Sequence, residues 1–258
     1  MTNIALITGA SSGIGKELAR YHAAKGGDLI LTARREPELN ALKSELEAAY
    51  KITAHVVALD LGAQGGAETL VQAVTKAGLK VDILINNAGF GGHGLHVERD
   101  LADEQVMIDL NIKALVALTH AFGQRMVAQG GGRILNVGST AGFMPGPRQA
   151  VYFATKAFVN SFSQAIDQEL RDKGVTCTVL APGYVETEFV QVANLEGTDL
   201  VKGGGATAVS VAKHGYDAMM KGKLVTVNQL SVSLLTQWVV PFLPRRMALK
   251  MVDKLQAK

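Results

Sequence analysis

The chain has 258 residues, 48% of them hydrophobic, and a mean hydropathy of +0.17. Because no linker, charge run or repeat divides the sequence, we expect a single domain over residues 1–258. The net charge of +3 comes from basic residues spread along the chain, which argues against a nucleic-acid partner.

Alternating apolar runs and helical periods predict the elements in chain order. Strands are expected at 3–8, 28–33, 53–59, 81–86, 133–138, 175–181 and 223–227. Helices are expected at 14–25, 36–49, 65–77, 103–129 (with a break allowed), 151–172 and 206–221. This alternation predicts an α/β fold with a doubly wound parallel sheet of the Rossmann type. Ligands bind such a sheet at the carboxyl ends of its strands.

Two features indicate the compartment. Cys177 is the single cysteine, so no disulfide can form within the chain, and its apolar run predicts a small buried side chain. The first strand begins at residue 3, which leaves no room for a signal peptide. We therefore expect a cytoplasmic protein.

A glycine-rich segment, Gly9-Ala-Ser-Ser-Gly13-Ile-Gly15, follows the first predicted strand. At a strand-to-helix turn such glycines let the backbone pass close to a phosphate, and the helix N-terminus offers free N–H groups. The spacing GxxxGxG differs from the common GxGxxG fingerprint. A tight turn without a ligand is the alternative, which the position between strand and helix disfavours.

The segment Asn86-Asn87-Ala88-Gly89 follows the fourth predicted strand. Small residues at a strand's carboxyl end let a ligand lie against the backbone, and Asn side chains can brace neighbouring loops. By itself, the segment would indicate a turn.

Tyr152 and Lys156 are four residues apart on a predicted helix, and Ser139 precedes Tyr152 by thirteen residues. Residues at i and i+4 share one helix face. A cation about 5 Å from a phenol, at an effective dielectric of about 20, contributes roughly 3 kcal/mol, or about two pKa units. We therefore expect Lys156 to lower the pKa of Tyr152 and to make it a general acid/base. A lone YxxxK pair is common, so this hypothesis depends on the other motifs.

Together these residues resemble the short-chain dehydrogenase/reductase family in its single-domain, NADP-preferring form. The resemblance runs from residue 3 to about 190, and no catalytic position departs from the family pattern. The motifs occur in the family's order: Thr8-Gly9-xxx-Gly13-x-Gly15, Asp60, Asn87-Ala88-Gly89, Asn111, Ser139, Tyr152-xxx-Lys156 and Pro182-Gly183-xxx-Thr187.

The resemblance implies four catalytic residues: Asn111, Ser139, Tyr152 and Lys156. Tyr152 would donate a proton to a carbonyl oxygen that Ser139 also hydrogen-bonds. Lys156 would bond the nicotinamide ribose, with Asn111 steadying it through water. Asp60 would contact the adenine, and residues 185–187 would hold the nicotinamide amide. The full set of expected cofactor contacts is Gly9, Ser11, Ser12, Gly13, Ile14, Gly15, Arg34, Arg35, Asp60, Leu61, Asn87, Ala88, Gly89, Tyr152, Lys156, Pro182, Gly183, Val185 and Thr187.

The end of the second predicted strand favours NADP(H) over NAD(H). A carboxylate there would bind the ribose 2′-hydroxyl and repel a 2′-phosphate. This chain instead has Arg34-Arg35, with no acid before Glu36. Two guanidiniums suit a phosphate by charge and geometry. A solvated arginine pair at a helix start is the alternative.

The expected substrate contacts are Ser139, Phe143, Met144, Tyr152 and Tyr184, with residues 184–222 as a lid. Their apolar character favours a hydrophobic or aromatic ketone or aldehyde. His93 and His96 lack metal-ligand partners in the sequence, so we expect no metal site.

Residues 230–258 are amphipathic, with Trp238, Phe242 and Leu243 before Arg245-Arg246. The apolar part is too short to span a bilayer, and Pro241 and Pro244 interrupt it. Three roles stay open: lying on a membrane surface, which is the least favoured, covering the pocket, or packing against a second subunit.

The predicted helix from Tyr152 is apolar on more than one side, which favours a homodimer or homotetramer. The resemblance supports the same association. Closure by the preceding helix and the C-terminal segment within a monomer is the alternative.

The sequence thus predicts an NADP(H)-dependent oxidoreductase of the carbonyl reductase or alcohol dehydrogenase type. A non-catalytic NADP-binding redox sensor is one alternative, although such proteins usually lack the Tyr or the Lys. A membrane-docked lipid carbonyl reductase is the other.

Overall fold

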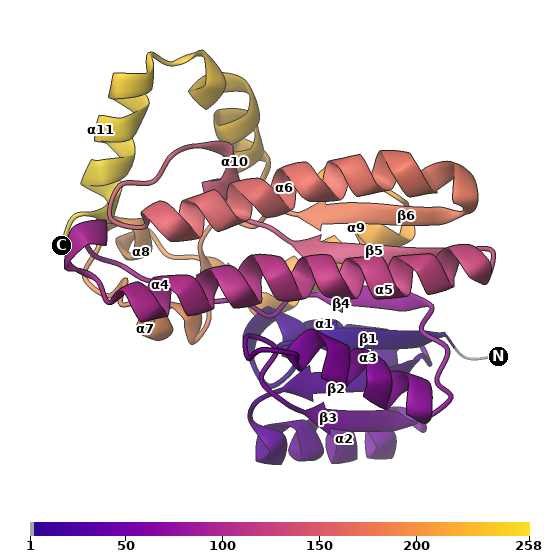
Figure 1. The fold of residues 1–258 in the computed structure, drawn as a ribbon. Helices are drawn as coiled ribbons and strands as arrows, with labels where there is room; N and C mark the ends of the chain where they lie inside the picture. The colour runs from indigo at the N-terminus through magenta and orange to yellow at the C-terminus, as the bar shows by residue number, and fades with distance from the viewer. Residues whose placement is uncertain (1–2) are drawn as a thin grey trace.

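A seven-stranded parallel sheet forms the centre of the computed structural model, which describes residues 3–258 (Figure 1). The strand order is β3-β2-β1-β4-β5-β6-β9, so the order reverses between β1 and β4. The strands are β1 Ile4–Thr8, β2 Asp28–Ala33, β3 Ala54–Ala58, β4 Ile83–Asn86, β5 Gly132–Val137, β6 Val175–Leu180 and β9 Val225–Thr226. The predicted doubly wound α/β fold is confirmed, and all seven predicted strands are present.

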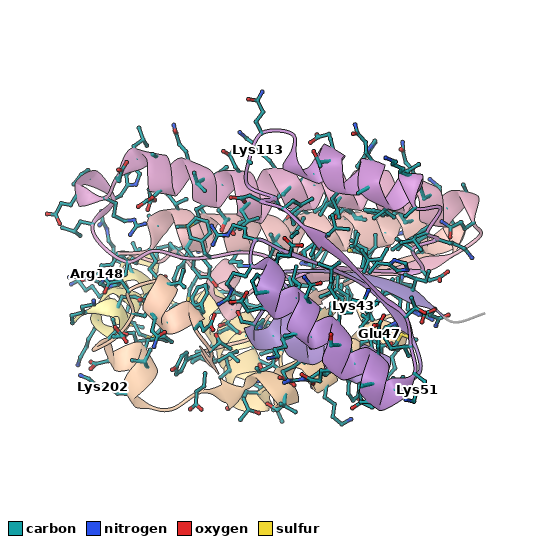
Figure 2. The ribbon with its side chains drawn as sticks, turned by 90° about the horizontal axis from the view of Figure 1, so that it is seen from below. Lys43, Glu47, Lys51, Lys113, Arg148 and Lys202 are labelled. Atoms are coloured by element: carbon teal, nitrogen blue, oxygen red, sulfur yellow. The ribbon has the colours of Figure 1, made fainter. Side chains whose placement is uncertain are left out.

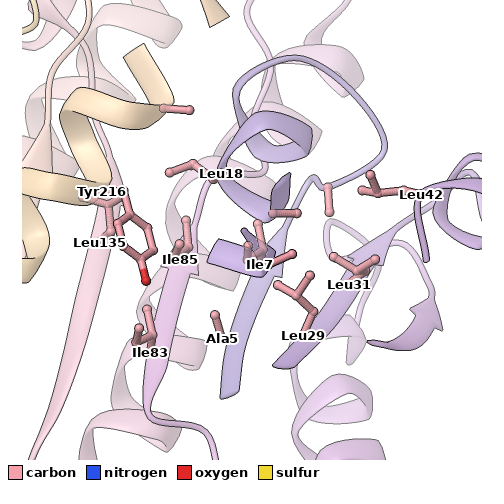
Figure 3. Packing of buried hydrophobic residues seen from close by; sticks show 14 of the residues in the cluster. Ala5, Ile7, Leu18, Leu29, Leu31, Leu42, Ile83, Ile85, Leu135 and Tyr216 are labelled. Carbon is pink, nitrogen blue, oxygen red and sulfur yellow. The ribbon is translucent and has the colours of Figure 1, made fainter. Parts of the chain in front are cut away.

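Helices cover both faces of the sheet because successive strand residues point to opposite sides. On one face Ile7 and Leu31 pack with Leu18 of α1 (Gly13–Ala23), Leu42 of α2 (Glu36–Tyr50) and residues of α9 (Ala208–Met220) (Figure 3). Along α2, Lys43 Nζ lies 3.9 Å from Glu47 Oε1 (Figure 2).

On the other face, residues such as Leu6 and Ile134 pack against α3 (Gly66–Lys76), α5 (Leu115–Ala128) and α6 (Ala150–Leu170). α4 (Leu101–Ile108) runs into α5 through a π-helical turn, Asp109–Ala114. The break that the sequence analysis allowed within 103–129 is therefore a π-helical turn, and the helix continues through it. In the described residues, the helix Leu101–Ala128 alone has the length and hydropathy of a membrane span, and 44% of that window is buried in the fold.

The connection between β6 and α9 and the segment after β9 gather beyond the carboxyl edge of the sheet (Figure 1). β7 (Val185–Glu186) pairs in parallel with β8 (Ala206–Thr207), with α7 (Phe189–Val192) and α8 (Asp199–Lys202) between them. α10 (Leu230–Leu234) and α11 (Arg245–Gln256) form the C-terminal arch. The predicted lid, 184–222, is too long, because Val211, Tyr216 and Met219 of α9 are buried in the sheet core.

Candidate active site

The glycine-rich loop after β1 is braced by Asn87. Asn87 Nδ2 donates to the carbonyl oxygens of Thr8 (3.0 Å) and Gly9 (3.2 Å). Gly9 and Gly13 have φ of +67° and +53°, which favours glycine. A Cβ on Gly15 would lie 2.3 Å from Gly9 O and 2.4 Å from Asn87 Nδ2, so only glycine fits there. The backbone turn is therefore as tight as the sequence predicts.

Thr8 joins this loop to the one after β4. Its Oγ1 accepts hydrogen bonds from the backbone N–H groups of Asn87 and Ala88, each at 2.9 Å. The two loops thus meet at the point where the strand order reverses, which is where doubly wound sheets bind ligands.

Arg35 lies at the edge of this crevice and is held by Glu188. Arg35 Nη2 donates to Glu188 Oε2 at 2.9 Å, and its guanidinium also reaches Ser11 Oγ at 3.3 Å. The Arg35 guanidinium holds the pKa of Glu188 below its usual value. Arg34 is exposed and lines the same cavity. Sequence reasoning did not foresee the acidic partner, because Glu188 is 153 residues away along the chain.

Ser139, Tyr152 and Lys156 come together between β5 and α6. Ser139 follows β5, and its Oγ accepts a hydrogen bond from the N–H of Ala141 (3.1 Å). Lys156 Nζ donates to Val137 O at 2.8 Å and lies 5.8 Å from the centroid of the Tyr152 ring. The three side chains line one cavity.

The pKa values of the pair differ from the sequence expectation. Burial raises the pKa of Tyr152 to about 12, although a hydrogen bond with Ser139 opposes the rise. Burial also lowers the pKa of Lys156 to about 8. The net pKa of Tyr152 is therefore raised, because desolvation of the phenol dominates and the Lys156 ammonium bonds the Val137 carbonyl.

Asn111 lies in the π-helical turn and braces the loop after Gly89. Its Oδ1 accepts from Phe90 N at 3.1 Å, and its Nδ2 donates to Phe90 O at 2.9 Å and to Thr155 Oγ1 at 3.1 Å. A Cβ on Gly89 would lie 2.9 Å from Asn111 Oδ1 and 3.6 Å from Lys156 Nζ. Asn111 and Lys156 therefore face each other across the Gly89 backbone.

One cavity of about 690 Å³ contains most of the predicted site. The predicted residues that line it are Gly9, Ser11, Ser12, Gly13, Ile14, Arg34, Arg35, Asp60, Leu61, Asn87, Ala88, Gly89, Ser139, Met144, Tyr152, Lys156, Pro182, Gly183, Tyr184, Val185 and Thr187.

Three predicted site residues do not line the cavity. Gly15 instead permits the close packing beneath the loop, and Asn111 acts from behind Gly89. Phe143 was expected to contact substrate, and this is corrected: it packs against the buried cluster of Val179, Ala181 and Val227. An aromatic ring beside an apolar cluster gains more from burial than from exposure in the cavity.

The outer part of the cavity contains residues that sequence reasoning missed. The C-terminal arch contributes its inner side, and α6 contributes Gln149 and Phe153. The residues from the arch are Val232, Leu235, Thr236, Val240, Met251, Val252, Leu255 and Gln256. Of the three roles left open for residues 230–258, covering the pocket is therefore observed. The amphipathic pattern of residues 230–258 indicated that one side of the segment is buried, but it did not identify the surface that this side contacts.

Side-chain contacts fasten α11 over the cavity. Gln149 Nε2 donates to Gln256 Oε1 at 2.7 Å, and His93 Nε2 lies 2.7 Å from Gln256 O. Arg148, which Figure 2 shows beside α11, donates from Nε to Asp253 Oδ1 at 2.8 Å. His93 thus has a structural role, while His96 Nδ1 lies 3.6 Å from Glu104 Oε2. Residues 3–258 contain no cluster of three or more metal-ligating side chains.

The chain is similar in sequence to a known family and to characterised proteins. Residues 3–198 match the family model for short chain dehydrogenase. Sulfoacetaldehyde reductase 2 of Chromohalobacter salexigens is 40% identical over 214 residues, covering 82% of this chain and 81% of the relative.

Two solved structures share the fold. A short-chain dehydrogenase from Sphingobium yanoikuyae in complex with NADPH has a TM-score of 0.84 and 31% identity, over 90% of each chain. A short-chain dehydrogenase/reductase from Burkholderia phymatum in complex with NAD has a TM-score of 0.82 and 25% identity, over 92% of each chain.

Proposed function

The chain belongs to the short-chain dehydrogenase/reductase family, as an oxidoreductase of alcohols and carbonyl compounds that uses a nicotinamide cofactor, and we propose that it is an NADP(H)-dependent reductase of uncharged, apolar ketones or aldehydes. The observation that carries the proposal is the convergence of Ser139, Tyr152 and Lys156 in a cavity that is otherwise mostly apolar.

The residues of the inner cavity fit a dinucleotide. The loop at Gly9 and Gly13 brings the backbone close to the cavity, and the first turn of α1 faces it with free N–H groups. Asp60 is oriented by a hydrogen bond from Gly62 N to its Oδ1 (2.9 Å) and would hold the adenine end. When bound, the reduced nicotinamide supplies a hydride for the carbonyl carbon.

In this proposal Tyr152 and Ser139 act on the carbonyl oxygen. With its pKa near 12, the phenol is protonated at neutral pH and can donate to the oxygen as negative charge develops there. The Ser139 hydroxyl hydrogen-bonds the same oxygen and stabilises that charge. Lys156, with its pKa near 8, is then suited to return a proton to Tyr152 from solvent, with Asn111 holding Gly89 beside it.

Arg34 and Arg35 support the preference for NADP(H). Guanidiniums bind phosphate bidentately, and both line the cavity at the end of β2. Glu188 already neutralises part of the Arg35 charge, so Arg34 would supply the unpaired charge for a 2′-phosphate.

The outer cavity favours an uncharged substrate. Among its described lining residues, the cations are Arg34, Arg35 and Lys156, and all three belong to the cofactor and catalytic side. A sulfonate aldehyde, the substrate named for the relative from Chromohalobacter salexigens, would therefore lack a cationic partner in this chain. Burying an unpaired anion is costly, whereas the rings and aliphatic chains around Phe153, Phe189 and Val252 suit an apolar group.

We further propose a homo-oligomer formed through α6. Its exposed side carries an uncharged stripe, Ala154, Ala157, Phe158, Ser161 and Ala165, with Phe158 stacked on Phe162. The repeat of this stripe is helical, so a second copy could cover it in a two-fold contact.

A panel of carbonyl compounds followed by loss of NADPH absorbance tests the proposed function. Aromatic and medium-chain aliphatic ketones or aldehydes should be turned over with NADPH, and their sulfonated or carboxylated analogues should have much lower kcat/KM. Tight NADPH binding without turnover of any compound would instead favour the redox sensor. Equal use of the charged analogues would contradict the proposed substrate class.

A further inference from the structure

The outer side of the C-terminal arch exposes large apolar side chains. Leu230, Leu234, Trp238 and Phe242 are 77%, 51%, 69% and 80% exposed. They recur every four residues along the helical segment Leu230–Phe242, so they form one stripe. Singly exposed apolar residues are ordinary, but a continuous stripe with a tryptophan and a phenylalanine marks an interaction surface.

The opposite side of the same segment lines the substrate cavity through Val232, Thr236 and Val240, which also recur every four residues. The segment is therefore apolar on two sides for two reasons. Its inner side lines the cavity, and no other part of the described chain packs on its outer side.

Positive charge is concentrated beside the stripe. Residues 230–258 contain five cations, Arg245, Arg246, Lys250, Lys254 and Lys258, and one acid, Asp253, which pairs with Arg148. The whole chain carries a net charge of only +3, so this segment is the most basic part of an otherwise balanced protein. Within the described residues, neither Arg245 nor Arg246 is paired with a carboxylate.

We propose that residues 230–246 of the arch dock on an anionic lipid surface. Tryptophan and phenylalanine enter the interface between headgroups and acyl chains, and arginines beside them attract anionic headgroups. A second copy fits this surface less well, because a two-fold contact would bring two arginine pairs into one interface. The uncharged stripe on α6 offers the better contact between copies.

This docking surface is independent of the reaction proposed above. It would place the wall of the substrate cavity against the membrane, since the two sides of residues 232–240 face the cavity and the lipid. A failure of docking would leave the turnover of water-soluble carbonyl compounds unchanged, so the two proposals fail separately.

Trp238 is the only tryptophan of the chain, so its fluorescence reports on this surface directly. Adding unilamellar phosphatidylcholine–phosphatidylserine vesicles to the NADPH-bound protein should shift the emission to shorter wavelength and sediment the protein with the vesicles. Phosphatidylcholine vesicles alone, or high salt, should give much weaker binding.

Variants locate the contact. Trp238→Ser with Phe242→Ser should reduce the vesicle-bound fraction roughly tenfold or more. Arg245→Gln with Arg246→Gln should weaken binding by about fivefold per arginine. The matched controls, Tyr50→Ser with Val209→Ser and Lys51→Gln with Lys76→Gln, change exposed residues on other elements and should bind as wild type.

Three results would overturn the proposal. The first is unchanged emission and no sedimentation of the wild-type protein with phosphatidylserine vesicles, which needs no variant to fold. The second is equal binding to neutral and anionic vesicles. The third is a blue shift that grows with protein concentration without lipid, together with a doubled mass that Trp238→Ser abolishes, which would make the surface a contact between copies.

Discussion

Gln149 Nε2 donates a 2.7 Å hydrogen bond to Gln256 Oε1, which joins the start of α6 to the last turn of α11 across 107 residues of sequence. Both side chains are buried and both residues line the cavity. The C-terminal helix is therefore part of the wall of the cavity, and a contact three residues before Tyr152 holds it there.

Gln256→Ala should loosen this closure. Loss of one hydrogen bond of about 1 kcal/mol predicts a rise in KM for the carbonyl substrate of roughly fivefold, with the Kd of NADPH unchanged. Steady-state kinetics and a fluorescence titration with NADPH measure the two quantities. Lys258→Ala, two residues further along, is the matched control, and an unchanged KM in Gln256→Ala would show that α11 does not shape the substrate site.

Tyr152→Phe tests the proton donor. Because no other phenol lies beside Ser139 and Lys156 in the described site, the variant should lower kcat by roughly 100- to 10,000-fold. The ring is retained, so the Kd of NADPH should stay close to that of wild type. Tyr184→Phe, which removes a different cavity hydroxyl, should keep most of the turnover. More than about a tenth of wild-type turnover in Tyr152→Phe would exclude the phenol as general acid.

Arg34→Asp with Arg35→Ala tests the cofactor preference. Each lost charge-assisted bond costs about 1.5–3 kcal/mol, so NADPH should bind roughly 100-fold or more weakly and the preference should move toward NADH. Binding of both cofactors is measured by titration. Selectivity equal to that of wild type would exclude a role in binding the 2′-phosphate.

Glu188 allows a second test of the same cofactor preference. Removing its charge in Glu188→Gln frees Arg35, so NADPH should bind more tightly than to wild type. Glu38→Gln is the matched control, because Glu38 Oε1 is 4.0 Å from Arg35 Nε rather than 2.9 Å.

Lys156→Met should separate stability from activity. Burial lowers the Lys156 pKa from 10.5 to about 8, so the charged ammonium costs roughly 3 kcal/mol in the folded state below pH 8. After allowing about 1 kcal/mol for the lost bond to Val137 O, the variant should unfold a few degrees above wild type at pH 7, without turnover.

The pH dependence of that difference has a defined sign. Between pH 8 and 10.5 the unfolded chain holds a proton on Lys156 that the folded chain has lost, so wild-type stability rises with pH relative to the variant. The gap in Tm should therefore shrink toward pH 10. Calorimetry at pH 7 and pH 10 measures it, with the exposed Lys76→Met as control. A gap that widens with pH would contradict the lowered pKa.

Ala157→Glu tests assembly through α6. A carboxylate in the uncharged stripe should dissociate the proposed homo-oligomer, and light scattering measures the mass. Ala41→Glu adds the same charge at an exposed alanine of another helix, α2, and should leave the mass unchanged. A wild-type mass near 27.3 kDa at micromolar concentration would reject the oligomer altogether.

The sequence by itself determined the sheet and the residues that meet at its carboxyl edge. Strand and helix periods are local, so the order of elements follows from patterns within about ten residues. Gly9, Gly13, Ser139, Tyr152 and Lys156 follow strand ends or share one helix face, and parallel strands bring their carboxyl ends to one edge. Their convergence needed no knowledge of distant contacts.

Only the tertiary structure decided what depends on contacts between distant segments. The Arg35–Glu188 pair, the Gln149–Gln256 bond and the packing of Phe143 against Val179, Ala181 and Val227 each depend on how loops and helices pack together. The pKa of Tyr152 belongs to the same class: spacing in the sequence gives its distance to Lys156, but desolvation depends on every atom around the phenol. An amphipathic pattern likewise marks residues 230–258 as having two sides, and only their position over the cavity distinguishes the buried side from the exposed one.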